Sequence, residues 1–249
     1  MTSRLLERQR KSFDSLVESG VYGIDFDHSP AAKTFVGEVL RQVVPYFRQR
    51  DGLKILDCGC GTGAWLAYLH AELTRAGLAQ LRLCGFDFSE RMVDVARTRL
   101  HGLAAASDIR CGNILEQASY RFDGLRDGFD LIFTYDVVQQ LPRARQGECC
   151  GLIADALAPD GVALVFDNDA ESRFGRRMEL RKFLTRYCGL RLVPYHYCNA
   201  AYPRLERIRR HMEGARHLRA EIILRDDGVK RAMILAREAT ERKKAGTPA

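Results

Sequence analysis

Short apolar runs alternate with amphipathic stretches along most of the chain. The apolar runs predict buried strands within Leu53–Asp57, Leu81–Asp87, Ile109–Leu115, Phe129–Leu141 and Val162–Phe166. Between them, apolar residues recur at helical spacing, in stretches that run to about Arg75, start at Ser89-Glu90 and cover Gln146–Leu157. An alternation of strands and helices is typical of a parallel sheet with helices packed on its faces. We therefore predict an α/β core at residues 49–169.

The N-terminal part predicts helices. Residues 1–20 have the pattern of an amphipathic, exposed helix or of a mobile arm. Ser29 and Pro30 then mark a helix start, because serine is a good N-cap and proline is favoured at the first helical position. One apolar stripe follows, formed by Phe35, Val36, Val39, Leu40, Val43 and Phe47. We expect residues 1–48 to be a helical cap on the core.

The C-terminal part departs from a minimal α/β pattern. One helix is predicted through Leu180, Phe183, Leu184 and Tyr187, and a second, opened by Pro203, through Leu205, Ile208, Met212 and Ala215. We expect residues 170–218 to form a helical substrate cap. Apolar segments on both sides of Asp226-Asp227-Gly228 predict a hairpin at residues 219–238 that closes the sheet. Residues 239–249 read as a disordered tail.

A glycine-rich turn follows the first predicted strand. The segment Leu53–Trp65, LKILDCGCGTGAW, places Asp57 directly before Gly59, Gly61 and Gly63. Glycines let a backbone approach a ligand closely, and the following helix start offers free N–H donors. The carboxylate of Asp57 would repel a pyrophosphate and attract a ligand with a cationic end.

This D-x-G-x-G-x-G segment resembles the first motif of class I S-adenosylmethionine (SAM) dependent methyltransferases. The resemblance covers about Leu53 to Arg237 and includes an A-P-D-G turn at Ala158–Gly161. It implies a Rossmann-like, seven-stranded sheet, mostly parallel, with an antiparallel closing hairpin. It also implies SAM as the cofactor and S-adenosylhomocysteine (SAH) as the product.

Further cofactor contacts follow from the ends of the next strands. Asp87 ends the second strand, at the edge where open α/β sheets bind ligands, and its carboxylate can accept both hydroxyls of a ribose. Asn113 stands where the family usually has the aspartate that holds adenine. An Asn carbonyl oxygen can accept the same hydrogen bond. The resemblance extends the cofactor set to Cys60, Phe88, Met92, Gly112, Ile114 and Tyr135.

The acceptor side of such an enzyme is expected at Tyr135-Asp136 and Asp167-Asn168. Gln139-Gln140 replace the histidines common in related enzymes, and no N-P-P-Y or D-P-P-Y signature of DNA amino-methylating enzymes is present. The catalytic candidates are His196, Asp136 and Tyr135, with Tyr195 and His28 as further possible bases. Two structural alternatives stay open: His196 as a buried histidine among tyrosines, and Asp136 as the cap of the next helix.

The composition limits the cellular location, the membrane partners and the metal sites that we expect. The chain of 249 residues is 46% hydrophobic, and no apolar run approaches the roughly 18 residues of a membrane helix. The charged N-terminus lacks the apolar stretch of a signal peptide, so we expect a cytoplasmic protein with no membrane partner. Eight cysteines include no C-x-x-C and no zinc-type Cys/His spacing. We therefore expect free thiols and no metal site.

Positive charge is concentrated in one segment. The chain has a net charge of +7, and the stretch from Arg173 to Arg219 holds 13 Lys/Arg and 3 Glu. It can be a solvated helical face with Glu206–Arg210 and Arg209–Glu213 pairs, a docking surface for an acidic or carrier-bound substrate, or an RNA surface in which aromatic residues stack on bases.

We predict methyl transfer to an O or N atom of a small metabolite or natural-product intermediate. The alternatives are an RNA or protein methyltransferase and a non-catalytic SAM-binding partner or regulator. The oligomeric state is not predicted.

Overall fold

The computed structural model describes residues 3–25, 27–104, 106–193, 200–216, 218–224 and 230–237. Its centre is a seven-stranded sheet in the order β3-β2-β1-β4-β5-β7-β6. The first five strands are parallel and the last pair is antiparallel, as the sequence predicts. The strands are β1 (Leu53–Cys58), β2 (Leu81–Asp87), β3 (Ala106–Cys111), β4 (Phe129–Tyr135), β5 (Leu157–Asp167), β6 (Leu218–Leu224) and β7 (Arg231–Arg237).

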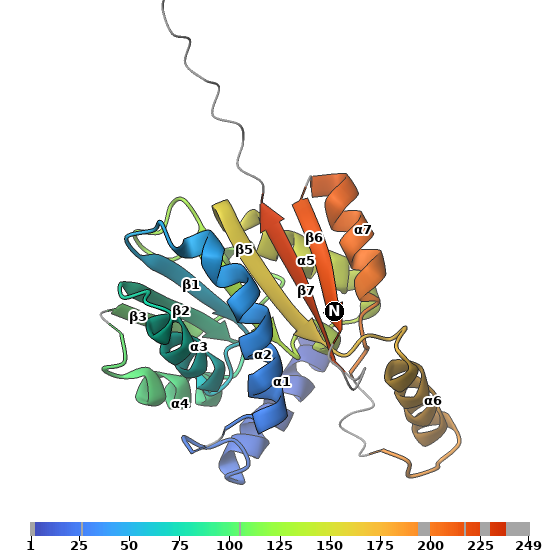
Figure 1. The fold of residues 1–249 in the computed structure, drawn as a ribbon. Helices are drawn as coiled ribbons and strands as arrows, with labels where there is room; N and C mark the ends of the chain where they lie inside the picture. The colour runs from blue at the N-terminus through green and yellow to red at the C-terminus, as the bar shows by residue number, and fades with distance from the viewer. Residues whose placement is uncertain are drawn as a thin grey trace, which may run out of the picture.

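Helices cover both faces of this sheet (Figure 1). One apolar cluster joins the sheet to α2 (Pro30–Val43), α3 (Ala64–Arg75) and α4 (Glu90–Leu100). A second joins the opposite face to α5 (Arg143–Asp155) and α7 (Leu205–Arg216). Short 3₁₀ turns lie at Val44–Phe47, Gln117–Tyr120 and Val138–Gln140.

The remaining helices lie outside these two layers. Helix α1 (Ser3–Glu18) lies below the carboxyl ends of the strands in Figure 1, and α6 (Arg173–Tyr187) stands to one side. Ser89 on α4 donates to Asp14 of α1 at 2.6 Å, and the rings of Phe13 and Phe88 meet edge to face at 5.6 Å. These contacts hold α1 beside the start of α4, at the edge where the glycine turn lies.

Helix α2 shows how the local sequence sets an element. The Ser29 hydroxyl accepts a hydrogen bond from the Ala32 N–H at 3.3 Å, and Pro30 occupies the first turn, as predicted. The predicted stripe faces the core: Phe35, Val36, Val39, Leu40, Val43 and Phe47 are all at most 3% exposed. Burying such a side chain is worth about 1.5–3 kcal/mol, so the stripe secures α2 against the sheet.

Two strand boundaries differ from the sequence prediction. Strand β3 starts at Ala106, before the predicted Ile109, and ends at Cys111, where the predicted exit loop begins. Strand β5 starts at Leu157, which pairs with Phe129, while Leu131 pairs with Val162. The expected turn at Ala158–Gly161 is therefore a bulge within β5, and it includes Asp160 at a φ of 59°.

The segment expected to form the substrate cap is divided in the structure. Helix α7 buries Leu205, Ile208 and Met212 and packs on β6 and α5, so it belongs to the core layer. Only α6 stands apart, held by a small cluster that includes Phe174 and Tyr202.

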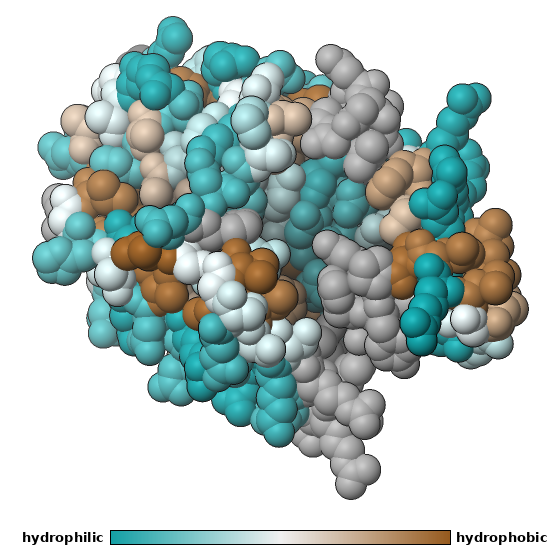
Figure 2. Space-filling view, turned by 90° about the horizontal axis from the view of Figure 1, so that it is seen from below, coloured by the Kyte–Doolittle hydropathy of each residue, from teal (hydrophilic) through white to brown (hydrophobic). Residues whose placement is uncertain are grey.

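The apolar stripe predicted on α6 points to solvent, because the opposite face makes its contacts with the body. The α6 side of Figure 2 shows a brown area, and the exposed aliphatic residues and phenylalanine of α6 and of the segment after it are Leu180, Phe183, Leu190 and Leu192.

The expected ion pairs and free thiols are present within the described residues, and two other expectations lie outside those residues. The Glu206–Arg210 and Arg209–Glu213 pairs are present on α7, at 3.2 and 2.8 Å. Every cysteine in the described part of the chain is a free thiol. The described helices include none with the length and apolar character needed to cross a bilayer. The hairpin turn at 226–228 and the tail at 239–249 lie outside the described residues.

Candidate functional site at the carboxyl edge of the sheet

The glycine turn links β1 to α3 at the carboxyl edge. The N–H groups of Gly59 and Cys60 both donate to the carbonyl of Phe86, at 2.8 and 3.0 Å, and so tie the turn to β2. A Cβ on Gly59 would lie 2.6 Å from Val137, which leaves no room for a side chain. Gly61, at a φ of +51°, would place its Cβ where no atom lies within 4 Å. The backbone at Gly61 therefore faces open space that a ligand can use.

Asp57 is buried directly before this turn. It is 1% exposed, and its Oδ2 has no hydrogen-bond partner among the described residues. Burial, and then the charge of Asp87, raise the pKa of Asp57 well above its ordinary value. A buried carboxylate oxygen without a donor is costly. The site is therefore suited to a ligand that brings an N–H donor or a positive charge to this oxygen.

Asp87 lies on the same edge, one strand away. Its two oxygens accept from the N–H groups of Gly61 at 3.0 Å and Ser89 at 2.9 Å. Burial raises its pKa to about 6, against the lowering effect of these bonds. Each oxygen retains a lone pair that can accept a ligand hydroxyl. The two acids thus share one edge, with open space beside the glycine turn that joins them.

The predicted adenine-side residues have local roles in the structure. A Cβ on Gly112 would lie 2.9 Å from the Ser119 hydroxyl, so this glycine is needed for packing. The Asn113 side chain accepts from Leu115 N at 3.1 Å and donates to Glu116 at 2.9 Å. A role for Asn113 in holding adenine stays a prediction. Three more of the predicted contacts are buried, namely Cys60 in the glycine turn, Met92 in the first turn of α4 and Ile114 in the loop after β3.

Aromatic rings pack together around Trp65 and Tyr135 at this edge. His28, on the segment before α2, stacks on Trp65 with ring centroids 4.1 Å apart, and Tyr135 lies 4.6 Å from the same indole. Burial lowers the pKa of His28 to about 4, so the imidazole is neutral at pH 7. A neutral His28 can accept a hydrogen bond, but an imidazole with so low a pKa is a weak proton acceptor, which argues against His28 as the general base.

The structure describes some of the catalytic candidates and not others. His196 and Tyr195 lie outside the described residues. Asp136 does not cap the following 3₁₀ turn, which has no side-chain cap. Its carboxylate instead forms an ion pair with Lys230, whose ammonium also lies 4.0 Å from the centre of the Tyr135 ring.

The sequence reasoning missed Lys230 at this edge, and it named Asp167 on the acceptor side without predicting its burial. Lys230 lies directly before β7. A charged residue immediately before an apolar strand is the sequence signal that could have identified it. Asp167, at the end of β5, is fully buried and its Oδ2 has no hydrogen-bond partner in the described structure. Burial and the charge of Asp136 raise the pKa of Asp167.

Two other possible sites carry less chemistry. The described residues contain no group of three His, Cys, Asp or Glu side chains placed to hold a metal ion.

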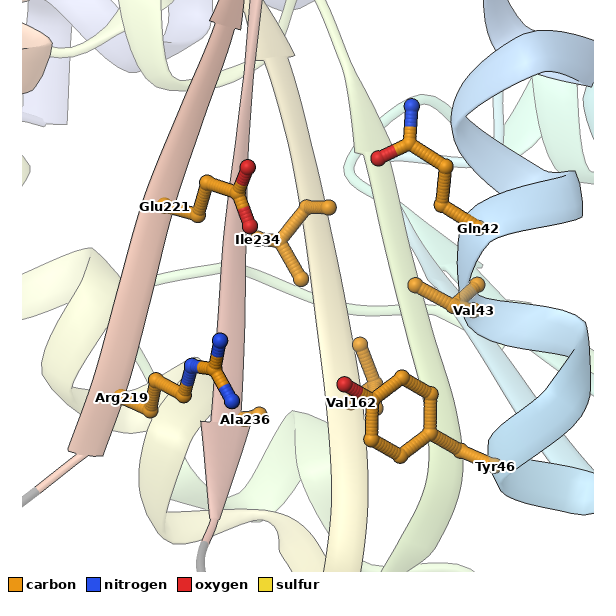
Figure 3. A pocket seen from close by; sticks show the side chains of 8 residues that line it. All are labelled: Gln42, Val43, Tyr46, Val162, Arg219, Glu221, Ile234 and Ala236. Carbon is orange, nitrogen blue, oxygen red and sulfur yellow. The ribbon is translucent and has the colours of Figure 1, made fainter.

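A cavity of about 150 Å³ lies between α2 and the β5–β7–β6 part of the sheet (Figure 3). It is lined by Gln42, Val43, Tyr46, Val162, Arg219, Glu221, Ile234 and Ala236. Val162 pairs with Ala236, far along the strands from the Asp167–Arg231 pair. The cavity is therefore remote from the carboxyl edge.

Comparison with known proteins agrees with this geometry. Residues 55–161 match the family model described as a methyltransferase domain. The demethylmenaquinone methyltransferase of Lactococcus lactis subsp. lactis (strain IL1403) is 32% identical over 102 residues, which are 40% of this chain and 36% of that protein. The chain thus spans little more than a third of the length of this curated relative.

Solved structures share the fold at low sequence identity. Magnesium protoporphyrin IX methyltransferase from Synechocystis PCC 6803 with bound SAH superposes with a TM-score of 0.62 at 19% identity, over 93% of this chain and 99% of that one. Mitomycin 7-O-methyltransferase superposes with a TM-score of 0.55 at 19% identity, over 90% of this chain and 60% of that one. Residues 55–161 of this chain therefore resemble a methyltransferase domain, and the seven-stranded Rossmann-like sheet around them has the fold of the solved methyltransferases named above.

Proposed function

We propose that the chain is a SAM-dependent methyltransferase that acts on a small molecule. The observation that carries this proposal is the buried Asp57 Oδ2, which lacks a donor and lies beside the open backbone of Gly61. The amino group of a SAM methionine end would provide that donor. The matched methyltransferase domain supports the same conclusion, because it spans the Asp57 turn, Asp87 and β4.

The residues present fit this cofactor. Asp57 would hold the amino group, the glycine turn would lie against the amino-acid and ribose portions, and Asp87 would accept the ribose hydroxyls. Tyr135 and Trp65 would form the wall beside the reacting methyl. When bound, SAM supplies an electrophilic methyl that an O or N nucleophile takes in line, as the C–S bond breaks and its electron pair stays on sulfur. Because this methyl is already activated, the chain mainly supplies proximity and orientation.

The acceptor that we propose is a small metabolite or natural-product intermediate methylated at O or N. The names of the similar proteins support a small acceptor, since they refer to a quinone precursor, a porphyrin and mitomycin. A general base is needed only for a nucleophile that is protonated at pH 7. Neutral His28, which lies near Tyr135, can accept a hydrogen bond from such a nucleophile and so help to orient it.

Labelled transfer tests the proposal. The purified chain is incubated with SAM carrying a tritiated methyl group and with separate metabolite, RNA and protein fractions of a cell extract. We expect the label in the metabolite fraction. Label in the RNA or protein fraction alone would contradict the small-molecule acceptor. SAM binding without any transfer would instead support a non-catalytic partner or regulator.

The RNA alternative has one observation in its favour. Phe183 and Tyr187 of α6 are 54% and 68% exposed, and their rings lie 5.0 Å apart among arginines. Exposed aromatic rings beside cations can stack on bases and contact phosphates. RNA binding of this type weakens by orders of magnitude between low and physiological salt. Salt-dependent RNA binding that Phe183→Ala and Tyr187→Ala abolish would favour this second function.

A further inference from the structure

Four side chains at the carboxyl edge share one face of the sheet. Asp57 lies opposite Gly85 on β2 and Phe133 on β4, so Asp87 and Tyr135, each two residues further along, point to the same side as Asp57. Tyr135 pairs with Phe166, and Phe166 pairs with Ala232. Lys230 precedes Ala232 by two residues and belongs to the same face.

The ammonium of Lys230 reaches back across this face. It forms an ion pair with Asp136 and lies 4.0 Å from the centre of the Tyr135 ring, so it stands above β4 although its backbone precedes β7. Strand β4 is the direct neighbour of β1, which carries Asp57. The ammonium is therefore one strand from the carboxylate proposed to hold the cofactor, on the side away from Asp87.

The ammonium has spare hydrogen-bonding capacity. An ammonium offers three N–H donors, and within the described residues Lys230 makes one hydrogen bond, to Asp136. The residue is only 5% exposed, whereas the Asp136 side chain is 36% exposed. The pair therefore consists of a buried ammonium and a partly exposed carboxylate, and solvent reaches the pair from the Asp136 side.

The backbone at this position is also unusual. Asp136 has a φ of 60°, a left-handed conformation that few non-glycine residues adopt. The Asp136 N–H donates to Phe166 O at 2.8 Å, which holds this conformation at the end of β4. Such backbone outliers cluster at ligand sites. The neighbouring cation, Arg231, is paired with Asp169 at 3.0 Å.

We propose that Lys230 binds the methyl acceptor, and that this acceptor is an acid that is ionised at pH 7, with a carboxylate or an enolate oxygen at its reacting end. This inference rests on the function proposed above and names the class of its substrate. The oxygen anion pairs with the Lys230 ammonium over the Tyr135 ring, beside the methyl. The new O–C bond forms as the C–S bond breaks, and the leaving electron pair remains on sulfur as a neutral thioether.

This arrangement explains the chemistry of the edge. An acceptor that arrives as an anion has no proton to lose, so the transfer needs no general base. The Lys230 ammonium and a bound sulfonium would repel each other, and a negatively charged acceptor oxygen between them would reduce this repulsion, whereas a cationic acceptor would add to it. The acceptor anion therefore completes the charge pattern that Asp57, Asp87 and Lys230 begin.

The test fractionates the acceptors by charge. A cell metabolite extract is separated on a strong anion exchanger at pH 7, and the retained and unretained pools are each incubated with the full chain and methyl-tritiated SAM. We expect label in the retained pool. Label in the unretained pool alone would overturn this inference and leave the methyltransferase function standing. Absence of transfer to either pool would overturn both.

Three variants assign the effect to Lys230. We expect Lys230→Met to raise the KM for the labelled acid by about tenfold or more, since a charge-assisted contact is lost, while the SAM Kd changes less than about twofold. Lys230→Arg should restore part of the affinity. The control, Arg219→Met, removes an exposed cation at the opposite edge of the hairpin and should change neither constant.

A further variant allows the same test if Lys230→Met does not fold. If Lys230→Met does not fold, Asp136→Asn combined with Lys230→Met removes both charges and leaves no unpaired ion, and it must show the same rise in KM. An unchanged acceptor KM in a folded variant contradicts the inference. So does a SAM Kd that weakens in parallel with the KM, because this would mean that Lys230 only supports the fold.

Discussion

Substituting Asp57 by asparagine separates stability from binding. Asp57 is 1% exposed, and its unpaired oxygen lies near Asp87. Removing a buried, unpaired carboxylate should raise the free energy of unfolding of the ligand-free protein by about 1 kcal/mol or more. The same change removes the partner of the cofactor amino group, and a hydrogen bond to a charged group is worth about 1.5–3 kcal/mol. SAM affinity should therefore fall by about 10- to 150-fold.

The pH dependence of this gain follows from the raised pKa of Asp57. An acid whose pKa is higher in the folded protein is favourable when neutral, so its stability contribution is complete below the unfolded pKa and is lost as the pH rises through the folded pKa. The stability advantage of Asp57→Asn should therefore be present at pH 7 and absent at pH 3.8 and below. Urea unfolding across this range measures it, and titration calorimetry with SAM measures the affinity.

A buried acid at the other end of the sheet provides the control. Asp130 is 3% exposed, forms an ion pair with Arg50 and accepts from Lys54 N at 2.8 Å. Asp130→Asn should lower the free energy of unfolding and leave SAM affinity unchanged, the reverse of Asp57→Asn. If Asp57→Asn also destabilises the protein, or binds SAM as tightly as the parent, the reasoning about the unpaired oxygen is refuted.

Three further predictions concern the same edge. Gly61→Ala and Gly77→Ala each place a Cβ in open space at positive φ, so both should cost about 1 kcal/mol of stability. Only Gly61→Ala should weaken SAM binding in calorimetry, and equal binding by the two variants would argue against the open backbone as a ligand surface. Asp87→Ala should lower SAM affinity at least about tenfold with an unchanged circular dichroism spectrum; unaltered affinity would remove its ribose role. His28, with its pKa lowered to about 4, should cost the protein about 3 kcal/mol as the pH falls from 6.5 to 4. His28→Phe should abolish this loss in unfolding followed by the fluorescence of the single tryptophan, and an identical pH profile would contradict a buried neutral imidazole.

The sequence predicted the parts of the fold in which local and global signals agree. Strand β2 has the predicted bounds, Leu81–Asp87, because a continuous apolar run ended by an acid is typical of a central parallel strand. Ser29 caps α2 for the same local reason. The positions of Asp57 and Asp87 on one edge follow from parallel strands, whose carboxyl ends all meet at the same side of a sheet.

The rest depends on contacts that no local pattern encodes. The stripe on α6 has helical spacing, which predicts a helix but not which side of it the body covers, and Phe183 faces solvent. Lys230 reaches Asp136 only because β7 inserts beside β5, and two residues 94 positions apart in the sequence carry no local signal of such a contact. The stacking of His28 on Trp65 likewise depends on how α2 enters the fold.

The most direct test of the central claim is a crystal structure of the chain with SAH. The account predicts that the SAH amino group lies within hydrogen-bond distance of Asp57 Oδ2, that its ribose hydroxyls meet Asp87, and that its sulfur faces Tyr135. An SAH molecule bound elsewhere, or a bound SAH that leaves Asp57 Oδ2 without a donor, would contradict it.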